Sequence, residues 1–425
     1  MWTRYFCSDV ENEVIPGESE VLDMGATLCG SVASPFSPIG KRARFGATMI
    51  VKPQTYTFGH TSDDALPLRC GRKLGPVSIA YETWGSLNSE ASNAILVCHA
   101  LTGSAHAAGK YHESDKKPGW WDEMIGPGKA FDTDRYFIVC SNVLGSCYGS
   151  TGPTSINPAT GKAYAMSFPV ITVADMVNAQ VRLADFLGVK KWLSVVGGSL
   201  GGMQALQWAV AYPERVHSCL PIATTARLSP QAIGWDWVGR EAILSDPKFL
   251  GGEYTKEAPP ERGLAVARML AHITYLSDAS MNEKFGRRLQ QMSDVNYSFD
   301  LNYQVESYLN HQGLSFVGRY DANAYLYITR ATDYFDLASE GGGDLTAALA
   351  KSRCAFGIIS FSSDWLFTPA QSEELVASLL RLKREVFHCD IQSDYGHDAF
   401  LLEVETLGSL VRGFLSNQQR SFGNG

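Results

Sequence analysis

The chain has 425 residues, a formal net charge of −8 at pH 7, 45% hydrophobic residues and 19% charged residues. These values are typical of a soluble globular protein with a large core. Because the chain has no global positive field, we expect neither nucleic acid nor an anionic membrane as a partner.

The first 48 residues differ from the rest of the chain. Residues 1–48 are rich in Ser, Gly, Pro and acids and lack sustained periodicity, so we expect a poorly ordered extension before Met49, which looks like a natural start. The early acids argue against a mitochondrial transit peptide, and no basic segment followed by an apolar one marks a secretory signal. No apolar run reaches the roughly 20 residues of a membrane helix. Nine scattered cysteines without a C-x-x-C pair favour free thiols in a reducing compartment.

Strand-like and helical segments alternate through the first half of the remaining chain. Their order is strand 77–85, strand 93–101, strand 135–143, helix 172–189, strand 191–198 and helix 202–213. Thr172 is a plausible N-cap and Gly188 a plausible stop for the first of these helices. The alternation predicts an α/β fold with a doubly wound, mostly parallel sheet.

The alternation stops after residue 228 and resumes near residue 354. Between these points the pattern is mostly helical, and afterwards come a strand over 354–363, a helix over 369–383, a strand over 385–391 and a helix over 400–415. We therefore predict a core formed by residues 49–228 and 346–425. A helical cap, or lid, formed by residues 229–345 is expected to cover the carboxyl edge of the sheet.

A glycine-rich stretch marks a candidate nucleophile. The residues Gly197-Gly198-Ser199-Leu200-Gly201 fit G-x-S-x-G between a predicted strand and a predicted helix, which is the nucleophile elbow of α/β-hydrolases. Glycines flank such a serine because the turn is too tight for larger side chains. The context favours a nucleophilic Ser199 over a glycine-rich helix entry without chemistry.

A nucleophilic serine needs a base and an acid that orients the base, and in this fold they follow the serine in the order acid, then histidine. Asp364 directly follows an apolar strand, and His397 lies in a loop before the last helix. Asp390 is the rival acid, whereas His388 lies inside a strand pattern and is expected to be structural.

Two backbone amides are candidates for the oxyanion hole. The Leu200 N–H follows the nucleophile, and the Leu101 N–H lies in the loop after an early strand, where this fold places the second donor. His99 and His106 lie in the same loop, and we expect them to pack or form hydrogen bonds rather than to catalyse.

Seven motifs in order resemble the homoserine O-acetyltransferase family: YETWGSLN, HALTGSAH, PGWWDEMIGPGKAFDTDRYFIVCSNVLGSCYGSTGP, GGSLGGMQALQWA, ARMLAHITYLSD, SSDWLFTP and YGHDAFL. The resemblance runs from about residue 51 to about residue 415. It implies transfer of an acyl group from a coenzyme A thioester to the hydroxyl of L-homoserine, at the entry to methionine biosynthesis, by a cytoplasmic homodimer joined through the cap.

The same resemblance assigns roles to individual residues. It implies Ser199 as the acylated nucleophile, His397 as general base and acid, and Asp364 as the residue that orients His397. It implies Arg268 and Asp398 as the substrate-binding pair, for which a surface arginine and a helix N-cap are the alternatives. The implied ping-pong course uses acetyl-CoA as a co-substrate and no bound metal or redox cofactor.

Other functions stay open. The family admits a succinyl donor or a serine acceptor, and a plain esterase or a catalytically inactive binding protein could use the same fold. Succinyl transfer would call for a cation near the acyl group, and Leu366, two residues after Asp364, offers none. The long cap, Arg268 and Asp398 favour transfer over hydrolysis, because a transferase must exclude water.

Overall fold

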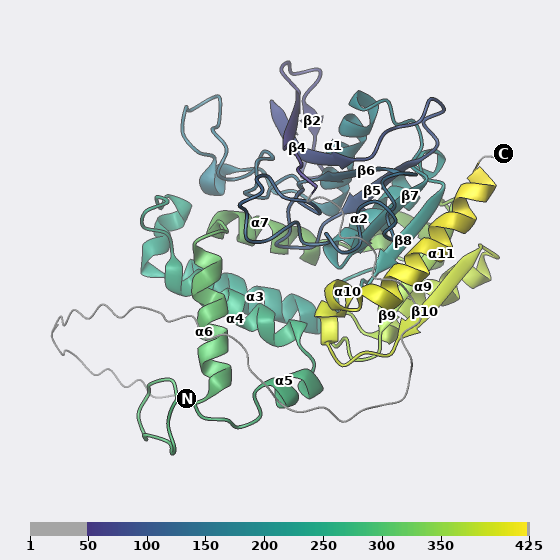
Figure 1. Ribbon diagram of the computed structural model, residues 1–425. Helices are drawn as coiled ribbons and strands as arrows, with labels where there is room; N and C mark the ends of the chain where they lie inside the picture. Colours follow the sequence, from purple (N-terminus) through teal and green to yellow (C-terminus); the bar gives the residue numbers. More distant parts are fainter. Residues whose placement is uncertain (1–48, 423–425) are drawn as a thin grey trace, which may run out of the picture. The chain divides into compact units, whose positions relative to one another are not determined.

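The computed structural model describes residues 49–422 of the chain. Its main feature is an eight-stranded sheet with the strand order β1-β4-β6-β5-β7-β8-β9-β10 (Figure 1). The strands are β1 (Gln54–Phe58), β4 (Val77–Trp84), β5 (Ala94–Cys98), β6 (Phe137–Ser141), β7 (Ser194–Gly198), β8 (Ser218–Ile222), β9 (Ala355–Phe361) and β10 (Val386–Ile391). A separate two-stranded sheet pairs β2 (Leu66–Pro67) with β3 (Lys73–Leu74).

The predicted mostly parallel sheet is confirmed. All neighbouring strands from β6 to β10 pair in parallel, whereas β4 is antiparallel to both of its neighbours, β1 and β6. The short parallel strand β7 leads directly into the helix that follows it, which places the end of β7 at the carboxyl edge of the sheet.

Helices cover both faces of the sheet. They are α1 (Val173–Phe186), α2 (Leu200–Ala211), α3 (Pro230–Leu244), α4 (Glu261–Tyr275), α5 (Asp278–Lys284), α6 (Gln304–Val317), α7 (Ala322–Asp333), α8 (Leu345–Leu349), α9 (Pro369–Arg381), α10 (Ala399–Leu402) and α11 (Val404–Phe422). Short 3₁₀ helices lie at η1 (Ala165–Ser167), η2 (Pro213–Arg215), η3 (Pro247–Gly252), η4 (Leu337–Gly341) and η5 (Gly396–Asp398).

The apolar run of β5 is buried on both sides, as its sequence predicts. Ile95 and Val97 belong to the core that includes side chains of α11, whereas Leu96 and Cys98 belong to the core that includes side chains of α1, α2 and α9. The sheet is therefore the middle of three layers, and a functional site at β5 and β7 has to lie at an edge of the sheet, where the strands end.

The observed ends of two predicted helices show which boundaries the local sequence predicts and which it does not. The hydroxyl of Thr172 accepts a hydrogen bond from the Asp175 amide, the Asp175 carboxylate accepts one from the Thr172 amide, and Gly188 has a φ of +74°. The helix predicted over 400–415 is wrong in one respect, because it is divided into α10 and α11. Glu403 joins them with a ψ of 50°, which interrupts the helical path without a local Gly or Pro.

The regular elements between β8 and β9 are helices, in the stretch for which the sequence predicts a cap. Helices α3, α4, α6 and α7 enclose a small core of their own, formed by side chains such as Ile243, Leu264 and Phe316. In Figure 1 these helices lie beside the main sheet. The boundaries 229–345 for the cap stay a prediction.

The C-terminal end of α4 is fastened to two loops of the core. The Trp365 Nε1 donates to the Leu276 carbonyl at 2.9 Å, and the Ser277 hydroxyl donates to the Asp394 carbonyl. A Cβ at Gly396 would lie 2.5 Å from the Ser277 nitrogen, so the contact requires glycine there. Thus the turn after α4 touches both the loop after β9 and the loop after β10.

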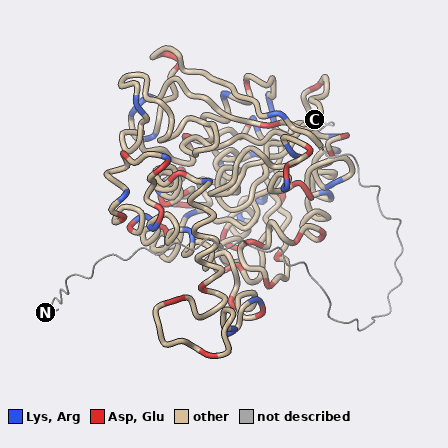
Figure 2. The backbone as a smooth tube through the Cα atoms, turned by 60° about the vertical axis from the view of Figure 1, so that its left-hand side comes forward, with Lys and Arg blue, Asp and Glu red and all other residues tan. Residues whose placement is uncertain are grey.

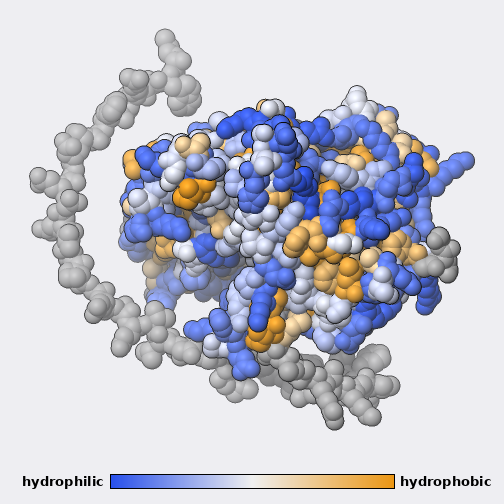
Figure 3. Space-filling model, turned by 90° about the horizontal axis from the view of Figure 1, so that it is seen from above, coloured by the Kyte–Doolittle hydropathy of each residue, from blue (hydrophilic) through white to orange (hydrophobic). Residues whose placement is uncertain are grey.

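The predicted extension 1–48 lies outside the described residues. Among residues 49–422, no helix is long and apolar enough to cross a membrane, and the seven cysteines in this range are free thiols. Basic and acidic residues are interspersed along the described chain (Figure 2). The face shown in Figure 3 is mostly hydrophilic, and its hydrophobic side chains form separate patches.

Candidate active site

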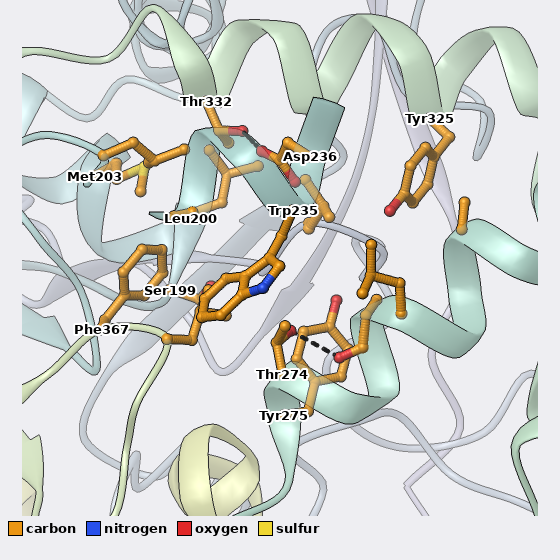
Figure 4. Close-up of a pocket in the computed structure, with 17 residues that line it drawn as sticks. Ser199, Leu200, Met203, Trp235, Asp236, Thr274, Tyr275, Tyr325, Thr332 and Phe367 are labelled. Carbon is orange, nitrogen blue, oxygen red and sulfur yellow. Dashed lines mark hydrogen bonds between the residues drawn. The ribbon is translucent and has the colours of Figure 1, made fainter. Parts of the chain in front are cut away.

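Ser199 lies at the sharp turn between β7 and α2. Its backbone has φ of 59° and ψ of −124°, a conformation that costs free energy for a residue with a side chain. The Ser199 amide donates to the Ile222 carbonyl of β8 at 3.0 Å, which helps to hold this conformation. Ser199 is 8% exposed and lines a cavity at the carboxyl edge of the sheet (Figure 4).

The glycines of the motif are required by close packing. A Cβ at Gly201 would lie 2.1 Å from the Cys98 carbonyl oxygen, and one at Gly197 would lie 2.4 Å from the Gly201 carbonyl carbon. Both distances are far shorter than a van der Waals contact. The turn can therefore pack against β5 only with glycine at both positions.

His397 and Asp364 form a buried pair. The His397 Nδ1 lies 2.7 Å from the Asp364 Oδ2, and the other carboxylate oxygen accepts hydrogen bonds from the Leu366 and Phe367 amides. The rival acid Asp390 instead accepts a hydrogen bond from the Ser360 hydroxyl. The structure thus places Asp364 at the histidine.

The environment of His397 favours its protonated form. Burial alone would lower the pKa of His397, but the charge and hydrogen bond of Asp364, together with the charge of Asp398, outweigh burial and raise the pKa above its usual value. Ser199 Oγ makes no hydrogen bond to His397 in the described structure. Such contacts commonly become short only in the substrate complex.

The loop after β5 offers a backbone amide beside Ser199. Neither the Leu101 amide nor the Leu200 amide donates a hydrogen bond to another described residue. The Leu200 amide is at the first turn of α2, where helix amides have no partner within the helix. Both residues line the same cavity as Ser199.

His99 holds the peptide that carries the Leu101 amide. The His99 Nε2 accepts a hydrogen bond from the Val143 amide at 3.0 Å, so the proton resides on Nδ1, which donates to the Ala100 carbonyl at 2.8 Å. The Ala100 carbonyl and the Leu101 N–H belong to one planar peptide unit, and fixing the first orients the second. Burial lowers the pKa of His99 to about 4, so the ring is neutral at physiological pH.

His106 anchors the other end of this loop. Its Nδ1 lies 3.0 Å from the Glu82 Oε2, and the Glu82 Oε1 accepts a hydrogen bond from the Tyr111 hydroxyl. Both loop histidines therefore form hydrogen bonds away from Ser199.

The cavity beside Ser199 has a volume of about 60 Å³ and is mostly apolar. It is lined by side chains of the core, including Leu366 and Phe367, and by side chains of cap helices α3, α4 and α7. One acid, Asp236 of α3, lies among them. Among the described residues that line the cavity there is no Lys, Arg or His. Within residues 49–422, no cluster of three or more His, Cys, Asp or Glu side chains could hold a metal ion.

Neither Arg268 nor Asp398 lines this cavity, but the Arg268 guanidinium lies over the ring of Tyr275, which does. Arg268 of α4 is 7% exposed, donates one hydrogen bond to the Thr102 hydroxyl at 3.3 Å, and stacks over the rings of Phe316 and Tyr275. It forms no salt bridge within the described chain, and its Nε has no partner there.

The Asp398 side chain does not cap α10, so the structure does not support the helix N-cap alternative. Burial raises the pKa of Asp398, while the charges of His397 and Arg268 oppose the rise.

Sequence reasoning did not single out Asp236. Asp236 lies four residues after Ala232 and four before Arg240, both buried, and therefore on the buried face of α3. This helical spacing is the signal that could have identified it. Its contact with Thr332 of α7 could not be foreseen, because the two residues are 96 positions apart.

Comparisons with known proteins agree with this geometry. The family model described as "alpha/beta hydrolase fold" matches residues 93–404. Homoserine O-acetyltransferase of Methanohalobium evestigatum is 54% identical over 354 residues, which are 83% of this chain and 72% of that protein. Homoserine O-succinyltransferase of Pseudomonas putida is also 54% identical, over 83% of this chain and 92% of that protein. The crystal structure of homoserine O-acetyltransferase from Bacillus anthracis has a TM-score of 0.81 and 32% identity, and the match covers 86% of this chain and 98% of that one.

Proposed function

The chain belongs to the family of homoserine O-acyltransferases with the α/β-hydrolase fold, and from this premise we propose that it transfers an acetyl group from acetyl-CoA to the hydroxyl of L-homoserine. The observation that carries the proposal is the buried Asp364–His397 pair, whose histidine packs at 5.2 Å against Phe367, a lining residue of the cavity of Ser199, the serine held at positive φ. This arrangement is suited to acyl transfer through a serine ester.

In the first half-reaction, His397 accepts the Ser199 proton as the hydroxyl oxygen attacks the thioester carbonyl. The Leu101 and Leu200 amides, which have no other partner among the described residues, stabilise the oxyanion. The C–S bond then breaks, the thiol of coenzyme A leaves with a proton from His397, and acetyl-Ser199 remains. The proposed course uses acetyl-CoA as a co-substrate and no bound cofactor.

In the second half-reaction, homoserine replaces coenzyme A. His397 accepts the proton of the homoserine hydroxyl, whose oxygen attacks the serine ester. The bond between Ser199 Oγ and the acetyl carbon then breaks, and His397 returns the proton to Ser199 Oγ. We propose that Arg268 binds the carboxylate of homoserine and that Asp398 binds its ammonium group. The side chains of Arg268 and Asp398 do not form a salt bridge with each other, so both charges are free for the substrate. Burial, and then the charges of Arg268, Arg319 and Lys284, lower the pKa of His272 to about 3, and these three nearby cations would favour a carboxylate.

The identity of the acyl group depends on the cavity, because relatives of equal identity carry different names. The acetyl- and succinyltransferases compared here are both 54% identical to the chain. Leu366 lines the cavity, and no cation among its described lining residues could bind the distal carboxylate of a succinyl group. Leaving that carboxylate unpaired in an apolar site would be costly. An acetyl group avoids this cost.

The proposal is tested by the mass of the intact protein after mixing with acetyl-CoA or succinyl-CoA. We expect the mass gain of one acetyl group, and none for Ser199→Ala, whose rate should fall on the order of 10⁶-fold. Addition of L-homoserine should remove the acetyl group faster than addition of L-serine or buffer alone. Equal rates in buffer would instead indicate an esterase, and a preferred succinyl adduct would indicate a succinyltransferase.

We further propose a cytoplasmic homodimer, joined through the cap, that serves methionine biosynthesis. The cap exposes large apolar side chains that a partner could cover, among them Trp237 and Val238 of α3, Val266 of α4 and Leu314 of α6. Sedimentation equilibrium of the full chain measures the oligomeric state, and a monomer at micromolar concentration would contradict the dimer.

A further inference from the structure

A second cavity, with a volume of about 510 Å³, adjoins the loop that carries the Leu101 amide. Tyr320 lines this cavity, and its hydroxyl donates to the Leu101 carbonyl at 3.2 Å. Leu101 also lines the Ser199 cavity, and it packs against the same small core of the cap as Cys147 and Val317, which line the second cavity. Leu101 thus lines one cavity and is hydrogen-bonded to the wall of the other.

Basic side chains from three separate segments line the second cavity. Lys162 precedes η1, Lys256 follows η3, and Arg319 lies between α6 and α7. All three residues are exposed to solvent, and Lys and Arg are charged at neutral pH. Within the described chain, none of the three forms a salt bridge or donates a side-chain hydrogen bond. Among the described residues, the second cavity thus offers three cations to a ligand, whereas the Ser199 cavity offers none.

The two acids that line the second cavity do not neutralise these cations. Asp321 accepts hydrogen bonds from the Tyr254 hydroxyl at 2.7 Å and, as the N-cap of α7, from the Ala324 amide at 2.8 Å. Burial raises the pKa of Asp321, and the charge of Lys256 opposes this rise, but the two side chains form no salt bridge within the described chain. Glu253 is exposed to solvent. The described lining of the cavity therefore keeps an excess of positive charge.

Arg319 brings the second cavity close to the proposed homoserine site. Its guanidinium lies 5.4 Å from the centre of the Phe316 ring, over which Arg268 also lies, at 4.7 Å. Burial, and then the charge of Arg268, lower the pKa of Arg319. Two like charges in such proximity repel each other, and an anion beside Arg319 would relieve this repulsion.

The size of the Ser199 cavity limits what it can hold of an acyl-CoA donor. A cavity of about 60 Å³ has room for a small acyl group only. In acetyl-CoA, a long arm separates the thioester from a nucleotide that carries several phosphate groups, so these phosphates must bind outside the Ser199 cavity. Phosphate oxygens accept short, strong hydrogen bonds from Lys and Arg side chains. The second cavity supplies both the room and the charge for them.

We propose that the second cavity binds the phosphate-bearing nucleotide end of the acyl-CoA donor, with Lys162, Lys256 and Arg319 as ligands of its phosphates. The inference rests on the proposed use of acetyl-CoA and locates the part of the donor that does not react. The arm of the donor passes Leu101 and brings the thioester to Ser199. The nucleotide thus contributes binding free energy at a distance from the reacting carbon.

The first experiment compares acetyl-CoA with S-acetylpantetheine, which has the same thioester and much of the same arm but no nucleotide. The second-order rate constant of Ser199 acylation is measured from the release of the free thiol before steady state. The variants are Lys256→Ala and Arg319→Ala. Lys248→Ala is the matched control, because Lys248 is an exposed lysine of η3 that does not line the cavity.

Lys256→Ala and Arg319→Ala should each lower the acylation constant for acetyl-CoA about 3- to 30-fold. The constant for S-acetylpantetheine should change less than about twofold in both variants, and Lys248→Ala should change neither constant by more than that. Arg319→Lys should keep part of the constant for acetyl-CoA, since a phosphate also accepts hydrogen bonds from an ammonium group. Equal losses for the two donors would mean that the residues act through the fold, and no loss for acetyl-CoA would mean that they do not touch it. Either result overturns the proposal.

A second experiment varies the salt concentration and needs no substitution. The chain has a net charge of −8 and as a whole repels an anionic donor, so screening of this global charge alone would speed acylation by acetyl-CoA. Contacts between phosphates and local cations have the opposite sign. Acylation by acetyl-CoA should therefore slow as NaCl rises from about 0.05 to about 0.5 M, and acylation by S-acetylpantetheine should stay constant. A constant for acetyl-CoA that stays level or rises with salt would refute the site.

A third measurement separates the site from the proposed function. Adenosine 3′,5′-bisphosphate has phosphates of the nucleotide end but no thioester, and its binding to the full chain is measured by isothermal titration calorimetry. It should bind, bind more weakly to Arg319→Ala, and slow acylation by acetyl-CoA but not by S-acetylpantetheine. Inhibition of both donors alike, or no binding, would refute the site. If neither thioester acylated Ser199 while the bisphosphate still bound, acetyl transfer would be refuted and the nucleotide site would stand.

Discussion

Replacing Arg268 by Ala is expected to leave the acetylation of Ser199 nearly intact and to weaken the use of homoserine strongly. The acetyl donor has no α-carboxylate near the reacting carbon, whereas homoserine has one. Arg268 donates only one hydrogen bond within the described chain, to Thr102, and its Nε has no partner there, so most of its donors are free for a ligand.

The magnitude follows from the burial of this side chain. Arg268 is 7% exposed and lies between aromatic rings, so its contact with a carboxylate would be largely shielded from water. Loss of such a charged partner costs about 2–5 kcal/mol, which corresponds to a loss of about 30- to several-thousand-fold in kcat/KM for homoserine. Arg268→Lys should keep only part of the kcat/KM for homoserine, because an ammonium group cannot form the planar two-pronged contact with a carboxylate.

The assay compares the burst of coenzyme A with steady-state homoserine kinetics. Arg262→Ala, on an exposed position of the same helix, is the matched control and should change neither. A thermal melt verifies that each variant is folded. If Arg268→Ala slowed the burst as much as it weakened homoserine use, Arg268 would be shaping the acylation site, and the carboxylate-binding role would be wrong.

Three further predictions concern the loop, the base and the N-terminus. His99→Gln loses the hydrogen bond to the Ala100 carbonyl and should slow the burst of coenzyme A about 10- to 100-fold. His99→Asn can still donate to that carbonyl and should keep a burst rate close to that of the unmodified chain. If both variants lost the same fraction of the burst rate, in proportion to their loss of Tm, the role of His99 would be merely structural. Asp398→Asn removes a charge that raises the pKa of His397. Because His397 must be deprotonated to act as a base, the fall of the burst rate on the acid side of its pH profile should move to lower pH. A fall that does not move, or that moves to higher pH, would contradict this coupling. A chain that begins at Met49 should keep the turnover and Tm of the full chain, and loss of most turnover would assign a role to the residues before it.

The parts of the site that could be predicted from the sequence are those whose structure is determined by residues close together in the chain. Ser199 is recognisable because the strand, the glycines and the helix that create its conformation lie within about 15 residues of each other in the chain. His397 and Asp364 could be predicted because each follows a strand, and parallel strands end at one edge of the sheet. The roles of Arg268 and Asp398 came from resemblance alone, and they stay proposals.

The remaining features depend on contacts that no local pattern records. Periodicity predicts that α3 is a helix, but not that Asp236 meets Thr332 of α7 in the cavity. Alternating hydrophobicity likewise does not give strand direction, so the antiparallel pairing of β4 was not foreseen. The break at Glu403 has no glycine or proline to mark it.

The attachment of α4 to the core has a consequence for the timing of the reaction. The turn after α4 is bonded through Leu276 and Ser277 to the loops that carry Asp364 and His397. A swing of α4 away from the sheet would break these bonds and disturb the acid and base together. Any displacement of α4 from the sheet would therefore be coupled to the positions of the loops that carry Asp364 and His397. In the proposed course, water that entered during such a displacement would meet the acetyl ester of Ser199 without an aligned base, so the ester would be protected from hydrolysis between donor and acceptor.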